Sequence, residues 1–484
     1  MSLVASTQLR RWAESTSCHG VADVWRCRSV IIRLLVWYPA LACCTGMLCF
    51  ALVDLFAGIH EHTWQTRLYE TDEGRRGLAF PTVIICNFNR VRKSAAERYN
   101  LTDDMLAYIF AAYRGNYDTA WRYVTAEMDA KFDHWAQQHN MRHLAAALTH
   151  TCEDTLLSVK YNLHTERHAC ANAGAQHMRV KEILISEMGR CLSIKVNQSQ
   201  HEAGYLRGLN LLLNVQTYEY VALTDNNVQD VGFAIQLKYG DSLQRGRWIA
   251  AAPRQEIHTF IGLKQTRETV KRELIEWRPP PCVERPKLRV YPDSWYTLNK
   301  CRMDCRAHYD VKYCNCELTN ASDKYAQCRA ISDWMRCIRE HYQLKRQSPD
   351  DDPAVQACFG ACLPQCEQTN VEYQLTRSEY PSATQSEQLA AKLRAEMNSE
   401  GVAEATVNQV TGAYVRENVV AVDIYFRTMF VTVTETRLRQ GVSTLLSQIG
   451  GVVSLWIGAS YITFYHAIVY FVNFICDLVR KRIP

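Results

Sequence analysis

Two long apolar stretches stand near the two ends of the chain, with a long region of mixed polarity between them. The first, residues 34–59, follows a short arginine-rich segment. The second, residues 441–476, contains no Asp, Glu, Lys or Arg. The hydrocarbon core of a bilayer is about 30 Å thick, and about 20 apolar residues cross it as a helix. The pattern therefore predicts two membrane-spanning helices, at 34–59 and 441–476.

The second stretch is longer than a single crossing needs. A continuous helix over its uncharged length would reach roughly 55 Å at 1.5 Å per residue. It must therefore tilt strongly, break, or extend beyond the membrane. Three small residues, Gly458, Ala459 and Ser460, lie at its centre, and His466 follows them.

A signal peptide is the other interpretation of residues 34–59, because the Ala-Leu-Ala sequence at 40–42 looks like a cleavage site. The apolar run continues past that site and is too long for a signal peptide, which favours a spanning helix. Positive charges flank both spans on their outer sides, so residues 1–33 and 477–484 are expected in the cytoplasm. Residues 60–440 are then extracellular.

The extracellular region mixes helical and strand patterns. Residues 78–88, 183–240 and 418–436 contain short β-branched and aromatic runs that predict strands. Apolar positions recur at helical spacing in residues 101–150 and 383–400, which predicts surface helices. The expected fold class is α+β, with two transmembrane helices flanking one large extracellular domain.

Composition and motifs restrict the possible functions of the chain more than its possible folds. The chain is 48% hydrophobic, 22% charged and carries a formal net charge of +5, as expected for an ordinary folded protein. It has no Gly-x-Ser-x-Gly elbow, His-Glu-x-x-His pair or phosphate-binding loop. We therefore expect no enzyme activity, no cofactor, no bound metal and no nucleic-acid partner.

Fourteen of the 20 cysteines lie between the predicted spans. Fourteen is an even number, and disulfides persist in the oxidising extracellular environment, so these cysteines indicate seven disulfides. Zinc is the alternative for the dense block at 301–366, but the spacings lack paired zinc knuckles. These cysteines are Cys86, Cys152, Cys170, Cys191, Cys282, Cys301, Cys305, Cys314, Cys316, Cys328, Cys337, Cys358, Cys362 and Cys366.

Three Asn-x-Ser/Thr sequons also lie between the spans, at Asn100, Asn197 and Asn320. Each is a candidate for N-glycosylation if this region is extracellular. Their positions agree with the predicted topology.

Several motifs, in order along nearly the whole chain, resemble the degenerin, epithelial sodium channel and acid-sensing channel superfamily. The motifs are His19-Gly20, FPTVIICNFNRVR (80–92), CRMDC and CNC (301–316), CFGACLPQC (358–366), ENVVAVDIYF (417–426) and LLSQIGGVVSLWIGAS (445–460). The spacing within 358–366 is similar to epithelial and FMRFamide-gated members, which slightly favours the invertebrate peptide-gated branch.

The resemblance implies a trimeric, sodium-preferring, amiloride-sensitive channel in the plasma membrane. Each subunit would have a hand-like extracellular domain with palm, finger, knuckle and thumb parts. Sodium ions, the blocker amiloride, membrane lipid and an extracellular peptide ligand are the expected partners. The resemblance does not distinguish a homotrimer from a heterotrimer.

The family's order of pairing also implies a disulfide connectivity, which the sequence alone does not choose. The implied pairs are Cys86 with Cys191, Cys152 with Cys170, Cys282 with Cys366, Cys301 with Cys362, Cys305 with Cys358, Cys314 with Cys337, and Cys316 with Cys328.

By the same resemblance, Gly458, Ala459 and Ser460 match the selectivity filter. Small residues let backbones approach closely, and an interrupted helix exposes carbonyls that replace an ion's hydration shell. The alternative is that they only pack one helix against another. His19 and Gly20 match the gating motif, although a His-Gly pair elsewhere is usually a solvated turn.

Ser447, Gln448 and Gly451 fall in the pore and gate region. Ser447 matches the position where bulky replacements hold related channels open. His466 stands where the family usually has Glu, and Val469 where it often has Asp, so strong sodium selectivity is in doubt. A charged histidine inside a membrane is energetically costly. We therefore give equal weight to two interpretations of His466: a functional side chain exposed to water, and a neutral side chain bonded to a neighbouring helix.

Asp72, Glu417 and Asp423 match the palm. Proton gating in the acid-sensing branch rests on carboxylates that share protons. Here Arg427, Thr432 and Thr436 stand at positions that are acidic in that branch, and Gln448 replaces an Asp above the pore. Activation by a peptide or other ligand therefore ranks above proton gating. Tyr, Trp and acids of residues 101–150 could bind an amidated basic peptide, or could simply pack the finger.

The sequence thus predicts an amiloride-sensitive, sodium-preferring cation channel gated by an extracellular ligand such as a neuropeptide. A proton-gated or constitutively open, pH-modulated channel is the first alternative. A non-conducting receptor subunit is the second alternative. His466 and Val469 are the residues that support this alternative.

Overall fold

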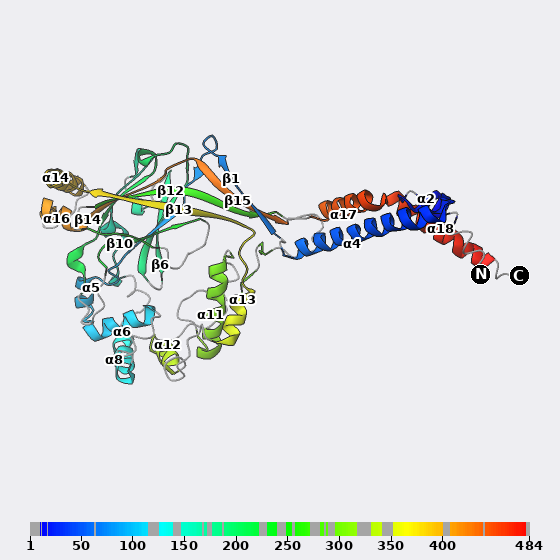
Figure 1. Ribbon diagram of the computed structural model, residues 1–484. Helices are drawn as coiled ribbons and strands as arrows, with labels where there is room; N and C mark the ends of the chain where they lie inside the picture. Colours follow the sequence, from blue (N-terminus) through cyan, green and yellow to red (C-terminus); the bar gives the residue numbers. More distant parts are fainter. Residues whose placement is uncertain are drawn as a thin grey trace. The chain divides into compact units, whose positions relative to one another are not determined.

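The elements of the chain fall into two units, which we describe separately (Figure 1). One unit comprises residues 1–67, 270–280 and 435–484, and the other comprises 68–269 and 281–434. The protein is described from a computed structural model. The description covers the chain except residues 1–9, 11, 17, 62–63, 115–124, 139–146, 167–168, 172–176, 186–187, 222–229, 240–247, 254–256, 272–280, 285–286, 289–295, 317–330, 341–351, 400–406, 439–440 and 481–484.

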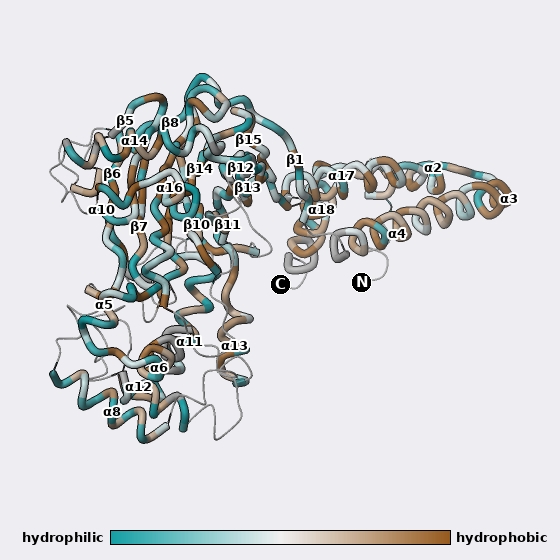
Figure 2. The backbone as a smooth tube through the Cα atoms, turned by 90° about the vertical axis from the view of Figure 1, so that its left-hand side faces the viewer, coloured by the Kyte–Doolittle hydropathy of each residue, from teal (hydrophilic) through white to brown (hydrophobic). Residues whose placement is uncertain are grey.

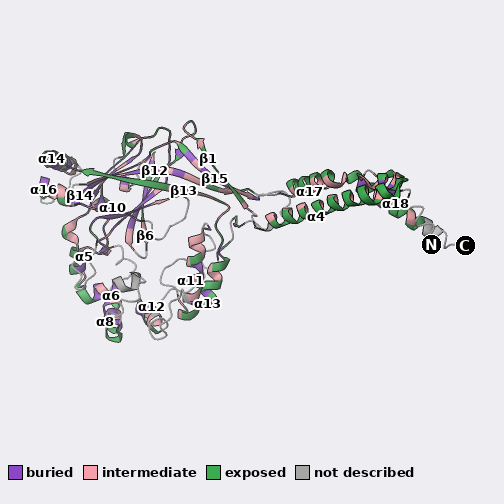
Figure 3. Ribbon diagram, in the orientation of Figure 1, coloured by how far each residue is buried: buried purple, intermediate pink, exposed green. Residues whose placement is uncertain are grey.

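The first unit contains one continuous apolar helix, Val30–Gly58, long enough to cross a membrane. It is built from α3 (Val30–Ile32), a π-helical turn η1 (Arg33–Trp37) and α4 (Tyr38–Glu61). Its mean hydropathy is 2.1 and its side chains are largely exposed (Figure 3). Apolar residues recur along its length (Figure 2), as expected for a helix surrounded by lipid. The helix begins four residues before the sequence-based boundary at Leu34.

The second apolar stretch is a broken helix. α17 (Val442–Ile457) and α18 (Tyr461–Arg480) meet at an angle of 75°, and together they pass the length and hydropathy test for one span. α17 packs against α4. A short helix, α2 (Val21–Arg26), precedes the first apolar helix.

Three sheets form the framework of the second unit. The largest has eight strands in the order β1-β15-β12-β14-β9-β4-β5, with β13 also paired to β12. A five-stranded sheet has the order β11-β10-β3-β7-β6, and β2 pairs with β8. The strands are β1 (Trp64–Asp72), β2 (Leu78–Ala79), β3 (Thr82–Asn87), β4 (Leu156–Tyr161), β5 (His164–Glu166), β6 (Met178–Ile185), β7 (Gly189–Val196), β8 (Ser199–Gln200), β9 (Leu209–Asn214), β10 (Phe233–Lys238), β11 (Ile249–Ala251), β12 (Ile257–Val270), β13 (Glu367–Glu379), β14 (Val419–Phe426) and β15 (Phe430–Leu438).

One apolar core joins the large sheet to the five-stranded sheet. β14 is buried along nearly all of its length, because its neighbours β12 and β9 and the core cover it. β12 alternates, with Thr259, Ile261 and Leu263 buried and His258 and Phe260 partly exposed on the other face. Burying one large apolar side chain contributes about 1.5–3 kcal/mol, so this core provides much of the unit's stability.

The helices of this unit lie mainly in two groups beside the sheets (Figure 1). α5, α6 and α8, which we call the finger helices, bury their own apolar cluster around Leu106, Tyr108 and Phe132. α11 and α13 lie side by side (Figure 1), and α14 packs against α16. The helices are α5 (Lys93–Arg98), α6 (Asp103–Arg114), α8 (Ala126–Gln137), α10 (Cys152–Thr155), α11 (Leu298–Cys314), α12 (Ile331–Ile338), α13 (Pro353–Ala361), α14 (Ala383–Ser399) and α16 (Gly412–Asn418), with 3-10 turns η3 (Ala169–Ala171), η4 (Tyr205–Arg207) and η5 (Thr217–Glu219).

The mixed α+β fold is as predicted, with local differences. The strand expected to follow the first span directly, 78–88, is preceded by β1. The run at 218–224 begins in a 3-10 turn rather than a strand, because Gln216 adopts a left-handed backbone (φ 52°) that turns the chain. The strand expected over 418–436 is two strands, β14 and β15. α11 occupies much of the first cysteine-dense segment, where no helix was predicted.

Six disulfides brace the second unit, and their partners are those that the family's order implies. Cys316 is also disulfide-bonded, but Cys328 lies outside the described residues. The six bonds are Cys86–Cys191, Cys152–Cys170, Cys282–Cys366, Cys301–Cys362, Cys305–Cys358 and Cys314–Cys337.

Candidate functional site

The three small residues of the second apolar stretch lie where its helix breaks. Gly458 ends α17 with φ +64°, a left-handed conformation that glycine adopts at low cost. Ser460 immediately precedes α18, and its hydroxyl accepts a bond from the Thr463 backbone N–H at 3.4 Å. The Thr463 hydroxyl in turn accepts a bond from the Ser460 N–H at 3.0 Å. This reciprocal capping fixes the start of α18.

The His19-Gly20 pair lies against this break. The His19 backbone N–H donates to the carbonyl of Ile457 at 2.9 Å. A Cβ atom added to Gly458 would lie 2.5 Å from the His19 ring. Gly20 is also left-handed, with φ +77°, and begins α2. The structure thus brings together the residues that match the gating motif and those that match the filter.

The other pore candidates are exposed on the two helices. Ser447, Gln448 and Gly451 lie on α17, and the Ser447 hydroxyl donates to the Ser443 carbonyl at 2.9 Å. A Cβ added to Gly451 would meet no atom within 4 Å. His466 lies on α18 with its side chain exposed.

The three palm candidates have different environments. Asp72 ends β1, and its carboxylate accepts the Gly74 N–H at 2.9 Å to stabilise a turn. Glu417 lies exposed on α16. Asp423 lies in β14 and is only 6% exposed. Of the three, Asp423 is the one held in a buried polar cluster.

The Asp423 carboxylate has two partners from neighbouring strands. Asn210 of β9 donates its side-chain amide to Oδ1 at 2.6 Å, and His258 of β12 places Nε2 2.8 Å from Oδ2. The His258 ring stacks on Phe260 with centroids 4.1 Å apart, and Tyr380 lies 5.2 Å away. A buried carboxylate is stable when it is hydrogen-bonded, and the Asn210 amide supplies such a bond to Asp423.

Basic side chains accompany acids elsewhere in the large sheet. Lys264 lies 2.8 Å from Glu70, and this hydrogen bond and charge lower the pKa of the Glu70 carboxyl. Arg427 donates to the side-chain carbonyl of Gln374 and lays its stem across Gly262, where a Cβ would meet it at 2.6 Å. Glu70 thus has a basic partner rather than the carboxyl partner that proton sharing requires.

A buried acid joins the finger helices to α12. The Asp129 carboxylate on α8 accepts the Tyr108 hydroxyl at 2.6 Å. Arg339, just after α12, lies 3.1 Å from its other oxygen. Burial, followed by the hydrogen bond to Asp129, raises the pKa of Tyr108, so the phenol remains protonated and donates. The Asp129 side chain is only 4% exposed, so this pair is well shielded from water.

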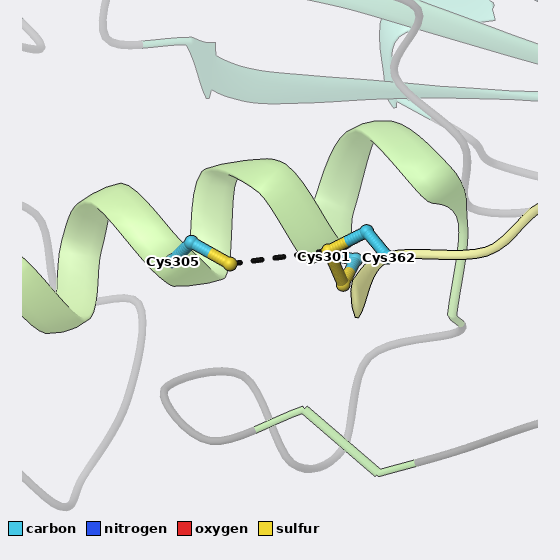
Figure 4. A group of neighbouring side chains, drawn as sticks. All are labelled: Cys301, Cys305 and Cys362. Carbon is cyan, nitrogen blue, oxygen red and sulfur yellow. Dashed lines mark hydrogen bonds between the residues drawn. A yellow bond between two sulfur atoms is a disulfide. The ribbon is translucent and has the colours of Figure 1, made fainter. Parts of the chain in front are cut away.

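The cysteine block does not form a zinc site where the structure describes it. The sulfurs of Cys301, Cys305 and Cys362 lie within 4.8 Å of one another, the spacing of a metal site (Figure 4). Each of them, however, is in a disulfide: Cys301 with Cys362, and Cys305 with Cys358. A metal needs free thiolates, and oxidised sulfur does not supply them.

Two of the three sequons can be placed. Asn100 and Asn197 are both exposed, with Asn100 in a turn of positive φ. Asn320 lies outside the described residues. Exposure at these two positions is compatible with glycosylation.

Sequence reasoning missed His258, Asn210 and Asp129. The alternation of apolar Ile261 and Leu263 with polar positions in 257–270 is a strand signal that could have placed His258 on a sheet face. No comparable signal links Asn210 to Asp423, because the antiparallel pairing of β9 with β14 brings them together from segments far apart in the chain. In the sequence, Asp129 has the pattern of an ordinary exposed helix residue, and only the tertiary packing shows that it is buried.

Comparison with known proteins agrees with these features. A profile of the amiloride-sensitive sodium channel family matches residues 12–470. Acid-sensing ion channel 1C of Danio rerio is 22% identical, over 99% of this chain and 87% of that protein. Acid-sensing ion channel 2 of Rattus norvegicus is 21% identical, over 99% of this chain and 88% of that protein.

The family profile spans both apolar stretches and nearly all of the disulfide-braced unit between them. That coverage accounts for the apolar helix, the broken helix and the disulfides together. The chain therefore belongs to the amiloride-sensitive sodium channel family, within the degenerin, epithelial sodium and acid-sensing channel superfamily, and is a cation channel rather than an enzyme.

Proposed function

We propose that this chain forms a trimeric, sodium-preferring, amiloride-blocked channel of the plasma membrane, opened by an extracellular ligand. Both termini lie in the cytoplasm, and α17 and α18 together form the second span. The observation that carries the proposal is the break at Gly458, with the His19 N–H bound to the Ile457 carbonyl at 2.9 Å.

The break supports ion conduction for a physical reason. Non-helical backbone at membrane depth is tolerated where it lines a water-filled cavity or is buried in protein. The last turn of a helix has carbonyls without intrahelical donors, and such carbonyls can replace the hydration shell of a cation. Gly458, Ala459 and Ser460 are small enough to let three copies approach one axis.

Ligand gating is supported by the partners of the acids. Glu70 is paired with Lys264, Asp129 with Arg339, and Asp423 with His258. An acid held by a cation takes up a proton less readily than one held by another carboxyl group. The hydrogen bond and charge of Lys264 lower the pKa of Glu70, so this carboxyl is a poor trigger for opening by mild acid. An amidated peptide with basic and aromatic residues is the ligand class that we expect, with the finger helices as its contact.

The test is two-electrode recording from oocytes that express this chain alone. Acid steps, FMRFamide-type peptides and amiloride are applied in sodium and in potassium solutions, with surface expression measured in parallel. Peptide-evoked current that amiloride blocks is the expected result. Current evoked by acid alone would overturn ligand gating, and silence at normal surface expression would favour a non-conducting or heteromeric subunit.

A further inference from the structure

A buried histidine lies where the finger helices join the rest of the second unit. The chain enters the finger through residues 87–92 and leaves it through residues 147–154, and we call these two segments the finger root. The Arg92 N–H donates to the Leu148 carbonyl at 2.8 Å, and the Arg92 guanidinium donates to the Ala147 carbonyl at 3.3 Å. The two segments are therefore tied together before the finger begins.

Both ring nitrogens of His150 are bonded within the finger root and the chain after β9. Nδ1 lies 2.7 Å from the side-chain oxygen of Gln216, so Nδ1 carries the proton. Nε2 lies 3.2 Å from the amide nitrogen of Asn89, which also donates to the Glu219 carbonyl at 2.7 Å. The two amide hydrogens of Asn89 are thus both used, and Nε2 accepts one of them. His150 is 6% exposed and Asn89 is 2% exposed.

This arrangement fits only the neutral imidazole. A second ring proton would point the Nε2–H at the Asn89 NH₂ group, setting donor against donor. The Asn89 side-chain oxygen is buried and has no hydrogen-bond partner, so a flip of the amide would supply an acceptor. The flip would also set that oxygen against the Glu219 carbonyl. Either way the protonated state loses at least one buried hydrogen bond.

The charged groups that face His150 come from three elements. Arg92 lies before α5 and is 3.3 Å from Asp154 of α10. Glu219 belongs to η5, and its carboxylate accepts the N–H and the hydroxyl of Ser94, each at 2.9 Å. Burial lowers the pKa of His150, and the Arg92 charge acts in the same direction. The Gln216 bond and the charges of Asp154 and Glu219 oppose this shift without reversing it.

We propose that His150 is a proton sensor at the finger root. Proton uptake breaks the Asn89–His150–Gln216 chain of hydrogen bonds and loosens the attachment of the finger helices to the ends of β3 and β9. The finger then moves more freely at acid pH. This inference does not depend on which stimulus opens the channel.

The direction of the pH effect follows from linkage. His150 has a lower pKa in the closed root than in an opened one, where it approaches the ordinary histidine value of about 6.5. The opened root therefore binds more protons in the window below that value. The equilibrium constant for opening rises by up to about tenfold per pH unit as the pH falls through this window. The effect is absent above the window.

The test is hydrogen exchange of the full-length protein in lipid nanodiscs at pH 7.5, 6.5 and 5.5, corrected for the intrinsic pH dependence of exchange. We expect the corrected opening constants of the finger root to rise by up to about tenfold over this range. His150→Gln keeps an acceptor for Asn89 but does not titrate in this range, so its opening constants should not change with pH. His134→Gln, which removes an exposed histidine of α8, is the matched control and should behave like the wild type.

Two results would overturn the proposal. One is a wild-type finger root whose corrected opening constants do not change between pH 7.5 and 5.5, a result that needs no variant to fold. The other is a His150→Gln protein that folds and keeps the full wild-type pH response, since another group would then bind the proton.

Discussion

Gly458 is the residue at which α17 ends and against which His19 lies. Its positive φ costs an alanine about 1 kcal/mol, and the added Cβ would meet the His19 ring at 2.5 Å. Gly458→Ala should therefore displace His19 and reduce the preference for sodium over potassium, measured as a shift of the reversal potential. Gly46→Ala is the control, because a Cβ there meets no atom within 4 Å. Equal reversal potentials for wild type and Gly458→Ala would show that the break is not the filter.

Asp423 illustrates how a single buried carboxylate can hold three strands together. Asp423→Ala leaves Asn210 of β9 and His258 of β12 without their shared acceptor. Removing one partner of a buried pair typically costs about 3 kcal/mol, so the midpoint of thermal unfolding should fall clearly. His258→Gln keeps a donor near Asp423 and should cost only about 1 kcal/mol. If the two variants have the same midpoint, the carboxylate is not the centre of this cluster.

At the scale of elements, α8 and α12 are joined through Asp129. Asp129→Ala removes the acceptor of the Tyr108 hydroxyl and the partner of Arg339, which should cost about 3 kcal/mol. Because the loss is local, hydrogen exchange should increase in α6, α8 and α12, while β14 remains protected. Glu127→Ala, at a more exposed position of α8, is the control. Uniform exchange across the unit would contradict a local role for this pair.

α17 offers a test of the pore assignment. Ser447 is exposed on this helix, one turn after Ser443. If this face lines the pore near the gate, Ser447→Phe should prevent closure and give a persistent, amiloride-sensitive current. Thr444→Phe, exposed on the neighbouring face of the same turn, should leave closure intact. Normal closure in Ser447→Phe would place the pore on a different face.

Elements with strong local patterns were the ones that the sequence predicted. The helix at 383–400 is α14, and the apolar helix from Val30 follows from composition alone. β14 and β15 appear in the sequence as one long strand, because the short break between them, at residues 427–429, lacks a glycine or proline signal. α11 was missed because its three cysteines obscure its helical spacing, and the disulfides stabilise it whatever its propensity.

At the scale of the whole molecule, the order of the motifs was more informative about the family than the pattern of apolar and polar positions. The family follows from motifs spread over the chain, and the profile match over residues 12–470 confirms it. The contacts that define the candidate site could not be predicted in this way. The bond from His19 to Ile457 and the buried Asn89–His150–Gln216 chain depend on tertiary packing between distant segments, for which single positions carry no periodic signal.

In the proposed trimer, three copies of His466 would form a ring, and we expect this ring to influence selectivity. Carboxylates near a pore raise the local concentration of cations, and neutral or positively charged imidazoles do not. His466→Glu should therefore raise the preference for sodium over potassium, seen as a more positive reversal potential when external sodium replaces potassium. His466→Gln separates charge from shape, since it changes the side chain without adding a negative charge, and should leave the preference unchanged. Unchanged reversal potentials in His466→Glu would mean that α18 does not face the permeating ions, and selectivity would then rest on Gly458, Ala459 and Ser460 alone.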